Sequence, residues 1–160
     1  RPAKLMAERT PDFLEEFGVQ VMKSNLHVPA NGSRFEPIIA KPGDGSAPSC
    51  AIIDEYHEHL DDTMYDTMLT GMGSREQPLT LIVTTAGDNL GGPCFNMQGE
   101  LQKVLEGTAQ ADDVWGVIYT TDADDDWASI EALRKANPNY DISVSEEFLK
   151  SQQFEAIRNP

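Results

Sequence analysis

The stretch Ser49–His59, SCAIIDEYHEH, constrains the fold more than any other part of the chain. Its short apolar run, Ala51–Ile53, leads directly into two adjacent carboxylates, Asp54 and Glu55. An apolar run of this kind is typical of a strand that is buried on both faces of a parallel sheet. Because ligands of open α/β sheets bind at the carboxyl ends of the strands, the two acids are expected at a functional edge.

A second predicted strand, residues 79–85, ends in Thr84 and Thr85 and is followed by Ala86-Gly87. At such an edge an Asp can orient Mg²⁺ through its waters, and the next residue can reach an attacking water. Hydroxyls on the neighbouring strand can bond a γ-phosphate or that water. The alternative interpretation is an ordinary pair of strand ends, because Asp and Glu are common where strands meet solvent and Thr favours strands before a turn.

Apolar spacing, turn residues and caps predict the remaining elements. Helices are expected over residues 3–17 (with a restart at Thr10-Pro11), 61–70, 95–105 and 127–136 and from Ser145 onward, and further strands near 19–21 and 26–28 and over 35–40, 49–54 and 114–119. Asn31-Gly32 predicts a hairpin turn near the N-terminus, and residues 41–48 predict a loop. Strands that alternate with helices indicate an α/β fold with a largely parallel sheet.

Composition limits the function. The net charge of −15 disfavours binding to a nucleic-acid backbone, so this segment is not expected to be the main DNA grip by itself. No apolar run approaches the ~20 residues that span a bilayer, so no membrane contact is expected. Cys50 and Cys94 are not in a CxxC pair, and both are expected to be reduced, small core residues.

Other chemistry-bearing residues admit two interpretations each. His57 and His59 could be metal ligands, but the spacing is not HExxH, and surface histidines after the strand are favoured. Arg75 could contact phosphate or a neighbouring subunit, or be a solvated loop residue. The acidic run Asp122–Asp126 could bind a cation, but it lacks the EF-hand pattern, and a solvated cap of the following helix is favoured.

Longer stretches, in order along the chain, carry a family resemblance. These are IIDEYHEH, GMGSREQPLTLIVTTAG, VWGVIYTTDADDDW and ALRKANPNYDISVSEEFL. Together they resemble the large subunit of tailed-bacteriophage terminases, the ATPase motor that packages viral DNA into procapsids. The resemblance implies a P-loop NTPase fold of the RecA/ASCE type, Mg²⁺ and ATP as cofactors, and a location in the cytoplasm of the bacterial host, from a phage or prophage gene. The partners it implies are viral double-stranded DNA, the portal protein, the terminase small subunit and further copies in a homo-oligomeric ring.

The resemblance also assigns roles to individual residues. Asp54 matches the Mg²⁺-organising acid of the Walker B strand, which acts through water, and Glu55 matches the catalytic acid that polarises the attacking water. Thr84 and Thr85 match the coupling motif that links hydrolysis to movement.

One departure from the family pattern is clear: no G-x-x-x-x-G-K-[ST] phosphate loop occurs in the sequence. We therefore expect a fragment, with residues 1–120 as the C-terminal part of the ATPase domain and 121–160 as a helical segment leading to an absent nuclease domain. Its partial sheet would lack the phosphate-loop strand, and the isolated fragment would be inactive. The exposed strand edge would be closed by residues 114–119 or by edge pairing in a dimer.

Two other functions stay open on the sequence alone. Asp54-Glu55-Tyr56-His57 fits the DExH box of a helicase-type ATPase, although no Arg-rich motif accompanies it. A non-catalytic acidic interaction module, in which the strand-end acids are incidental, is the third possibility.

Overall fold

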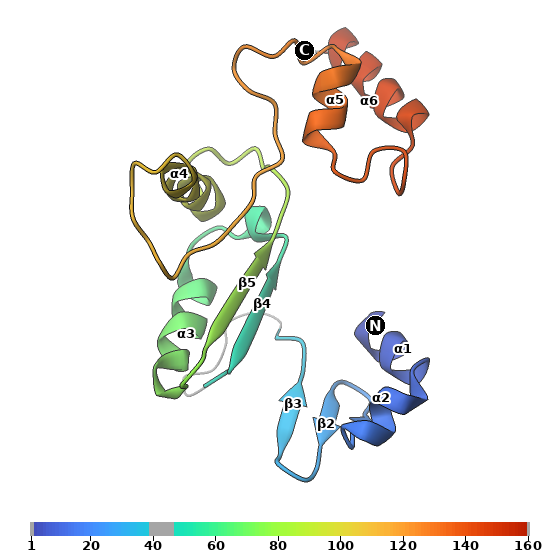
Figure 1. Ribbon diagram of the computed structural model, residues 1–160, viewed down its shortest axis with the longest axis vertical. Helices are drawn as coiled ribbons and strands as arrows, with labels where there is room; N and C mark the ends of the chain where they lie inside the picture. The colour runs from blue at the N-terminus through green and yellow to red at the C-terminus, as the bar shows by residue number, and fades with distance from the viewer. Residues whose placement is uncertain (1, 39–46, 160) are drawn as a thin grey trace. The chain divides into compact units, whose positions relative to one another are not determined.

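The computed structural model describes residues 2–38 and 47–159 (Figure 1). The chain divides into two units, Arg1–Phe95 and Asn96–Pro160, which are described separately below. Part of the strand expected over 35–40 and most of the loop expected over 41–48 lie outside the described residues. The boundary expected at residue 120 stays a prediction.

Two short helices begin the first unit, α1 (Pro2–Glu8) and α2 (Pro11–Glu16). The predicted restart is confirmed, because Pro11 occupies the first turn of α2, where its missing N–H costs nothing. Thr10 does not cap α2 with its side chain, since its hydroxyl donates to the carbonyl of Met6 at 2.9 Å. Gly18, at φ 61°, follows the helix in the left-handed region, as the sequence predicts.

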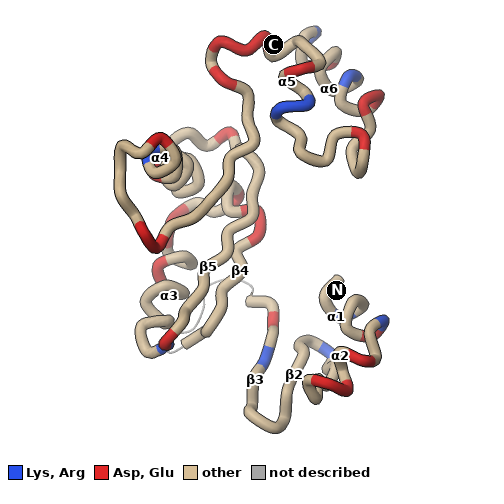
Figure 2. The backbone as a smooth tube through the Cα atoms, in the orientation of Figure 1, with Lys and Arg blue, Asp and Glu red and all other residues tan. Residues whose placement is uncertain are grey.

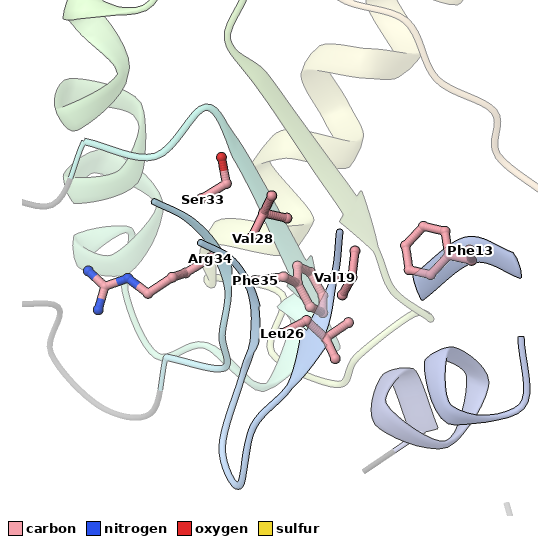
Figure 3. A pocket seen from close by; sticks show the side chains of 7 residues that line it. All are labelled: Phe13, Val19, Leu26, Val28, Ser33, Arg34 and Phe35. Carbon is pink, nitrogen blue, oxygen red and sulfur yellow. The ribbon is translucent and has the colours of Figure 1, made fainter. Parts of the chain in front are cut away.

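A small antiparallel sheet follows, with strands β1 (Gln20–Val21), β2 (Leu26–Val28) and β3 (Ser33–Phe35) in that order. The predicted turn between β2 and β3 is confirmed: Gly32 has φ 72°, and the Asn31 side chain accepts from the Ser33 N–H at 2.9 Å. An open pocket of about 300 Å³ lies between this sheet and α2 and is mainly apolar (Figure 3). It is lined by Phe13, Val19, Leu26, Val28, Ser33, Arg34 and Phe35.

The parallel pair that the sequence predicts is formed by β4 (Cys50–Asp54) and β5 (Leu79–Val83). Between them the chain passes through a 3-10 turn η1 (Tyr56–Glu58), helix α3 (Thr63–Gly71) and a second 3-10 turn η2 (Met72–Ser74). This is the crossover connection that a parallel pair requires. The register places Cys50 opposite Leu79 and Asp54 opposite Val83, so the two strands end together.

The sheet is buried on one face, which corrects the expectation of a doubly buried strand. Ala51 packs with Met68 and Met72 of the α3–η2 segment, and Met64 packs against this cluster. Along β4 buried and exposed residues alternate, so Ile52 is 52% exposed. Cys50 is exposed and Cys94 is only half-buried, so the expectation of two core thiols is also wrong. The reason is the two-residue repeat of a strand: a single covering helix buries alternate side chains only.

The predicted strand over 114–119 is wrong. Among the described residues, β4 and β5 pair only with each other, and a strand exists only where a neighbour completes its hydrogen bonds. The stretch instead lies against α4 (Pro93–Leu105): a Cβ built on Gly116 would come within 2.6 Å of Leu101 Cδ2. Apolar content indicated burial there, but it could not provide a pairing partner.

Two helices end the chain, α5 (Ile130–Ala136) and α6 (Glu146–Arg158). Ser145 caps α6 as predicted, because its hydroxyl oxygen accepts from the Phe148 N–H at 3.2 Å. The acidic run does not cap α5. That helix begins three residues later than expected, and Ser129 caps it by accepting from the Ala132 N–H at 3.1 Å.

Candidate functional site

The candidate site is the carboxyl end of the β4–β5 pair. Asp54 is the last residue of β4 and lies opposite Val83. The ladder then extends by one residue, because the Glu55 N–H donates to the Val83 carbonyl at 2.9 Å. Thr84 follows Val83 directly, so the pairing of the strands alone brings Glu55 and Thr84 to the same edge.

Glu55 has a backbone conformation that few residues adopt. Its φ of 52° and ψ of 49° lie in the left-handed region, which costs a non-glycine residue roughly 1–2 kcal/mol. The next residue holds the turn in place: Tyr56 is buried, and its hydroxyl donates to Asp62 Oδ1 at 2.8 Å. Burial and this hydrogen bond raise the pKa of the Tyr56 hydroxyl well above its usual range. The strained turn leaves the Glu55 side chain 58% exposed at the sheet edge.

Thr84 is tied to this turn by several polar contacts. Its Oγ1 accepts from the backbone N–H of His57 at 3.1 Å and also lies 3.1 Å from His57 Nδ1. The Thr84 hydroxyl donates to the carbonyl of Thr85 at 3.0 Å, and Cys94 Sγ lies 3.9 Å from Oγ1. The structure therefore brings Glu55 and Thr84 into one polar cluster.

The other two predicted residues lie beside this cluster without joining it. Asp54 is exposed, and its carboxylate makes no hydrogen bond or ion pair within residues 2–38 and 47–159. The Thr85 side chain is likewise exposed, and only its carbonyl takes part, as the acceptor for Thr84. Asp54 thus presents an unshared carboxylate to solvent one residue before Glu55.

His57 is the residue whose importance the sequence analysis missed. Its side chain is only 19% exposed, and its two ring nitrogens face carboxylates: Nδ1 lies 3.4 Å from Glu55 Oε2, and Nε2 lies 3.2 Å from Glu58 Oε1. His57 lies in the turn after β4, as the favoured interpretation expects, but its side chain is partly buried and engaged by its neighbours. His59 packs its ring against Tyr56, with centroids 5.2 Å apart. The DExH pattern in the sequence includes His57, but its contacts with Thr84, Glu55 and Glu58 follow only from the geometry of the turn.

The donor set at this edge fits one side of a Mg²⁺–nucleotide site. Mg²⁺ takes oxygen ligands, keeps several waters and is commonly held by one or two carboxylates together with substrate phosphates. The unshared carboxylate of Asp54 and the exposed carboxylate of Glu55 match that chemistry. The sequence holds no G-x-x-x-x-G-K-[ST] loop, so the donor set resembles the metal and water side of such a site and not its phosphate cradle.

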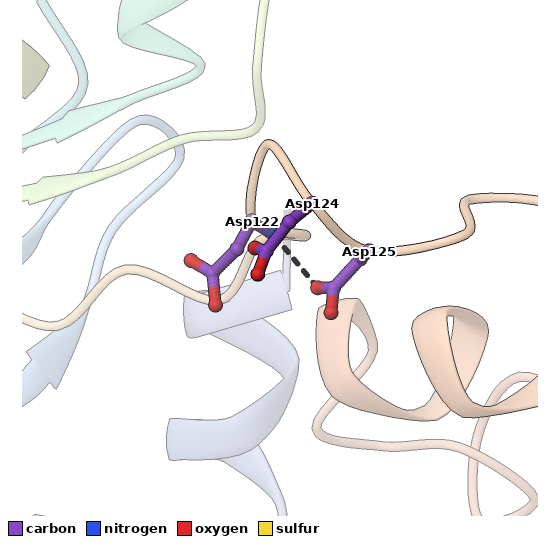
Figure 4. A group of neighbouring side chains, drawn as sticks. All are labelled: Asp122, Asp124 and Asp125. Carbon is purple, nitrogen blue, oxygen red and sulfur yellow. Dashed lines mark hydrogen bonds between the residues drawn. The ribbon is translucent and has the colours of Figure 1, made fainter.

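The two other charged candidates are engaged by the chain itself. Figure 4 shows the side chains of the acidic loop, Asp122, Asp124 and Asp125. From α5, Lys135 Nζ contacts Asp122 and lies 2.6 Å from Asp125 Oδ2. The hydrogen bond from Lys135 lowers the pKa of Asp125, and its two carboxylate partners raise the pKa of Lys135. The Arg75 side chain donates from Nε to the carbonyl of Ala47 at 2.8 Å, so in this structure it binds backbone.

Comparisons with known proteins identify similar sequences and a similar fold. Residues 3–103 match the family "Terminase large subunit, ATPase domain". Protein YmfN of Escherichia coli (strain K12) is 52% identical over 119 residues, which are 74% of this chain and 26% of YmfN. The crystal structure of the HK97 bacteriophage large terminase matches 93% of this chain and 31% of its own, with a TM-score of 0.75 and 22% identity.

Since the family match covers more than half of the chain, the protein belongs to the terminase large subunit ATPase family. Its α/β fold with a parallel sheet is similar to that of the phage terminase ATPase domain, a P-loop NTPase fold, and a small antiparallel sheet is also present. The chain spans about a quarter of the length of YmfN.

Charge and hydropathy add two observations. Acidic residues are spread over both units and outnumber the basic residues, 27 to 12 (Figure 2). Among the described helices, none combines the length and the hydropathy needed to cross a membrane.

Proposed function

We propose that this chain supplies the water-activating and coupling half of the ATPase site in a phage DNA-packaging motor. The observation that carries the proposal is that Glu55 and Thr84 both contact His57 at the end of the β4–β5 pair, one residue after the unshared carboxylate of Asp54. In this proposal Asp54 orients Mg²⁺ through its water shell, and Glu55 polarises the water that attacks the γ-phosphate. Bound Mg²⁺ would neutralise charge on the β- and γ-phosphates.

Thr84 and Thr85 are proposed to pass the state of the site onward. Thr84 contacts the Glu55–His57 turn on one side, and Thr85 begins the segment that leads to α4 on the other. A change at the nucleotide would therefore reach a helix through a short, hydrogen-bonded connection. We infer that this connection converts hydrolysis into DNA translocation.

The remaining context is also a proposal. The residues would act within a longer large subunit, alongside a phosphate loop and a nuclease domain, and the 160 residues alone would be inactive. Viral DNA, the portal protein, the small subunit and sister copies in a ring are the proposed partners, in the cytoplasm of the bacterial host. With a net charge of −15, this chain would contribute to the motor and not to the main DNA contact.

The test is Glu55→Gln in the full-length protein that contains these residues, assayed for Mg²⁺-dependent ATP hydrolysis and DNA packaging. Removing a general base costs about 10²–10⁴-fold in rate, and we expect such a loss with both activities falling together. Glu76→Gln, in an exposed loop, is the matched control and should retain both activities. If Glu55→Gln abolished both ATP hydrolysis and a DNA-unwinding activity, the protein would be a helicase. If hydrolysis were unchanged, only the interaction module would remain as an interpretation.

A further inference from the structure

We propose that His57 is a positioning residue whose Nδ1, in contact with both side chains, holds the catalytic carboxylate of Glu55 near the coupling hydroxyl of Thr84. This inference rests on the proposed function, because it assigns to His57 the task of joining the two residues that the proposal makes catalytic. Its observation is geometric: Nδ1 lies 3.1 Å from Thr84 Oγ1 and 3.4 Å from Glu55 Oε2.

The position of the His57 ring is fixed from two sides. The backbone N–H of His57 donates to Thr84 Oγ1, so the backbone of this residue is bonded to the segment that directly follows β5. Opposite, the absence of a side chain on Gly87 gives the ring room: a Cβ there would come within 2.8 Å of His57 Cβ. The ring therefore lies between the β4 turn and the segment that follows β5, with little freedom to leave either.

Counting protons assigns the ring nitrogens. The Thr84 hydroxyl has one hydrogen, and the carbonyl of Thr85 accepts it at 3.0 Å. With its hydrogen directed to that carbonyl, the Thr84 oxygen is the acceptor toward His57, and we infer that Nδ1 carries a hydrogen. Glu55 Oε2 lies 3.4 Å from the same Nδ1 as a charged neighbour, and Glu58 Oε1 faces Nε2 at 3.2 Å.

The contacts of Nδ1 with both Thr84 and Glu55 give the site a defined geometry. Glu55 and Thr84 are both exposed side chains, and without a common donor each could adopt several rotamers. The ring restricts both and leaves the far oxygen of Glu55 available for water. Groups that orient a catalytic or metal-binding residue in this way typically contribute about 10–100-fold to activity.

The decisive variants are His57→Asn and His57→Gln in the full-length protein, with His57→Ala as the deletion. An Asn amide can occupy the position of Nδ1, whereas a Gln amide reaches only the position of Nε2. We expect His57→Asn to retain kcat within about threefold, and His57→Gln and His57→Ala to lose about 10–100-fold in kcat. The KM for ATP should stay unchanged in all three, since His57 acts on the geometry of the reaction and not on nucleotide binding.

A second measurement does not depend on activity. Long-range ¹H–¹⁵N spectra of the histidine-labelled chain report which ring nitrogen carries a hydrogen, and we expect Nδ1 of His57 to do so. A bare Nδ1 would overturn the inference, as would equal kcat losses in His57→Asn and His57→Gln. Unchanged hydrolysis in Glu55→Gln would instead refute the proposed function, whatever the histidine variants do.

Discussion

At the scale of single residues, Tyr56 supports the strained turn at Glu55. We expect Tyr56→Phe to lower the free energy of unfolding by about 1 kcal/mol at neutral pH, because the hydrogen bond to Asp62 is lost while the buried ring remains. Chemical denaturation at pH 7 measures this change. Tyr119→Phe removes an exposed hydroxyl and should leave stability within about 0.5 kcal/mol.

The same residue gives the chain a defined pH dependence. The folded-state pKa of Tyr56 is raised above the unfolded value of about 10, so the folded state holds this proton more tightly. The corresponding stability is fully present below about pH 10 and is lost as the pH rises further. Denaturation curves of the wild type and Tyr56→Phe should therefore converge in alkali, and a constant difference up to high pH would contradict this assignment.

Residue types predicted part of the site, and backbone geometry supplied the rest. Asp54, Glu55 and Thr84 were predictable because an apolar run ending in polar residues identifies a strand end, and paired parallel strands end at one edge. His57 was not predictable in its role, because that role depends on the left-handed turn at Glu55, and such a conformation is uncommon for a non-glycine residue. Whether Asp54, Glu55, Thr84 and Thr85 act as proposed stays a prediction.

At the scale of elements, the N-terminal cap of α6 can be tested directly. We expect Ser145→Ala to destabilise α6 by about 1 kcal/mol, because the Phe148 N–H loses its acceptor. Ser151→Ala changes an exposed position within the same helix and should be neutral or slightly stabilising, since Ala is the better helix former. Amide exchange at Phe148 measures the effect, and equal exchange in the two variants would contradict the capping role.

Elements were predictable where the signal was local and failed where it was not. Ser145 as a cap, Pro11 in a first turn and Asn31-Gly32 as a hairpin turn all depend on neighbouring residues, and the structure confirms them. The strand over 114–119 required a partner distant in sequence, and apolar content alone could not identify one. The acidic run before α5 resembled a cap, but Lys135 pairs with two of its carboxylates, and Ser129 caps the helix.

At the scale of the whole molecule, one face of the parallel pair is exposed. Ile52 and Leu81 lie opposite each other on that face, at 52% and 44% exposure, and Leu79 and Val83 flank them. The free strand edge was expected to be closed either by residues 114–119 or by a second copy. Residues 114–119 do not close it, because no described strand other than β4 pairs with β5. Edge pairing with a second copy stays a prediction.

We therefore expect the isolated chain to self-associate, with an average mass that rises with concentration in sedimentation experiments. Exposed apolar surface next to an unpaired strand edge favours such association. Leu81→Lys places a charge in the centre of the face and should shift the chain toward monomer, because association would then bury an unpaired ammonium. Leu60→Lys is the control: it adds the same charge at an exposed position outside the sheet and should leave association unchanged. A wild-type chain that stays monomeric at every concentration would show that this face does not drive association, and equal effects of the two lysines would attribute the shift to net charge alone.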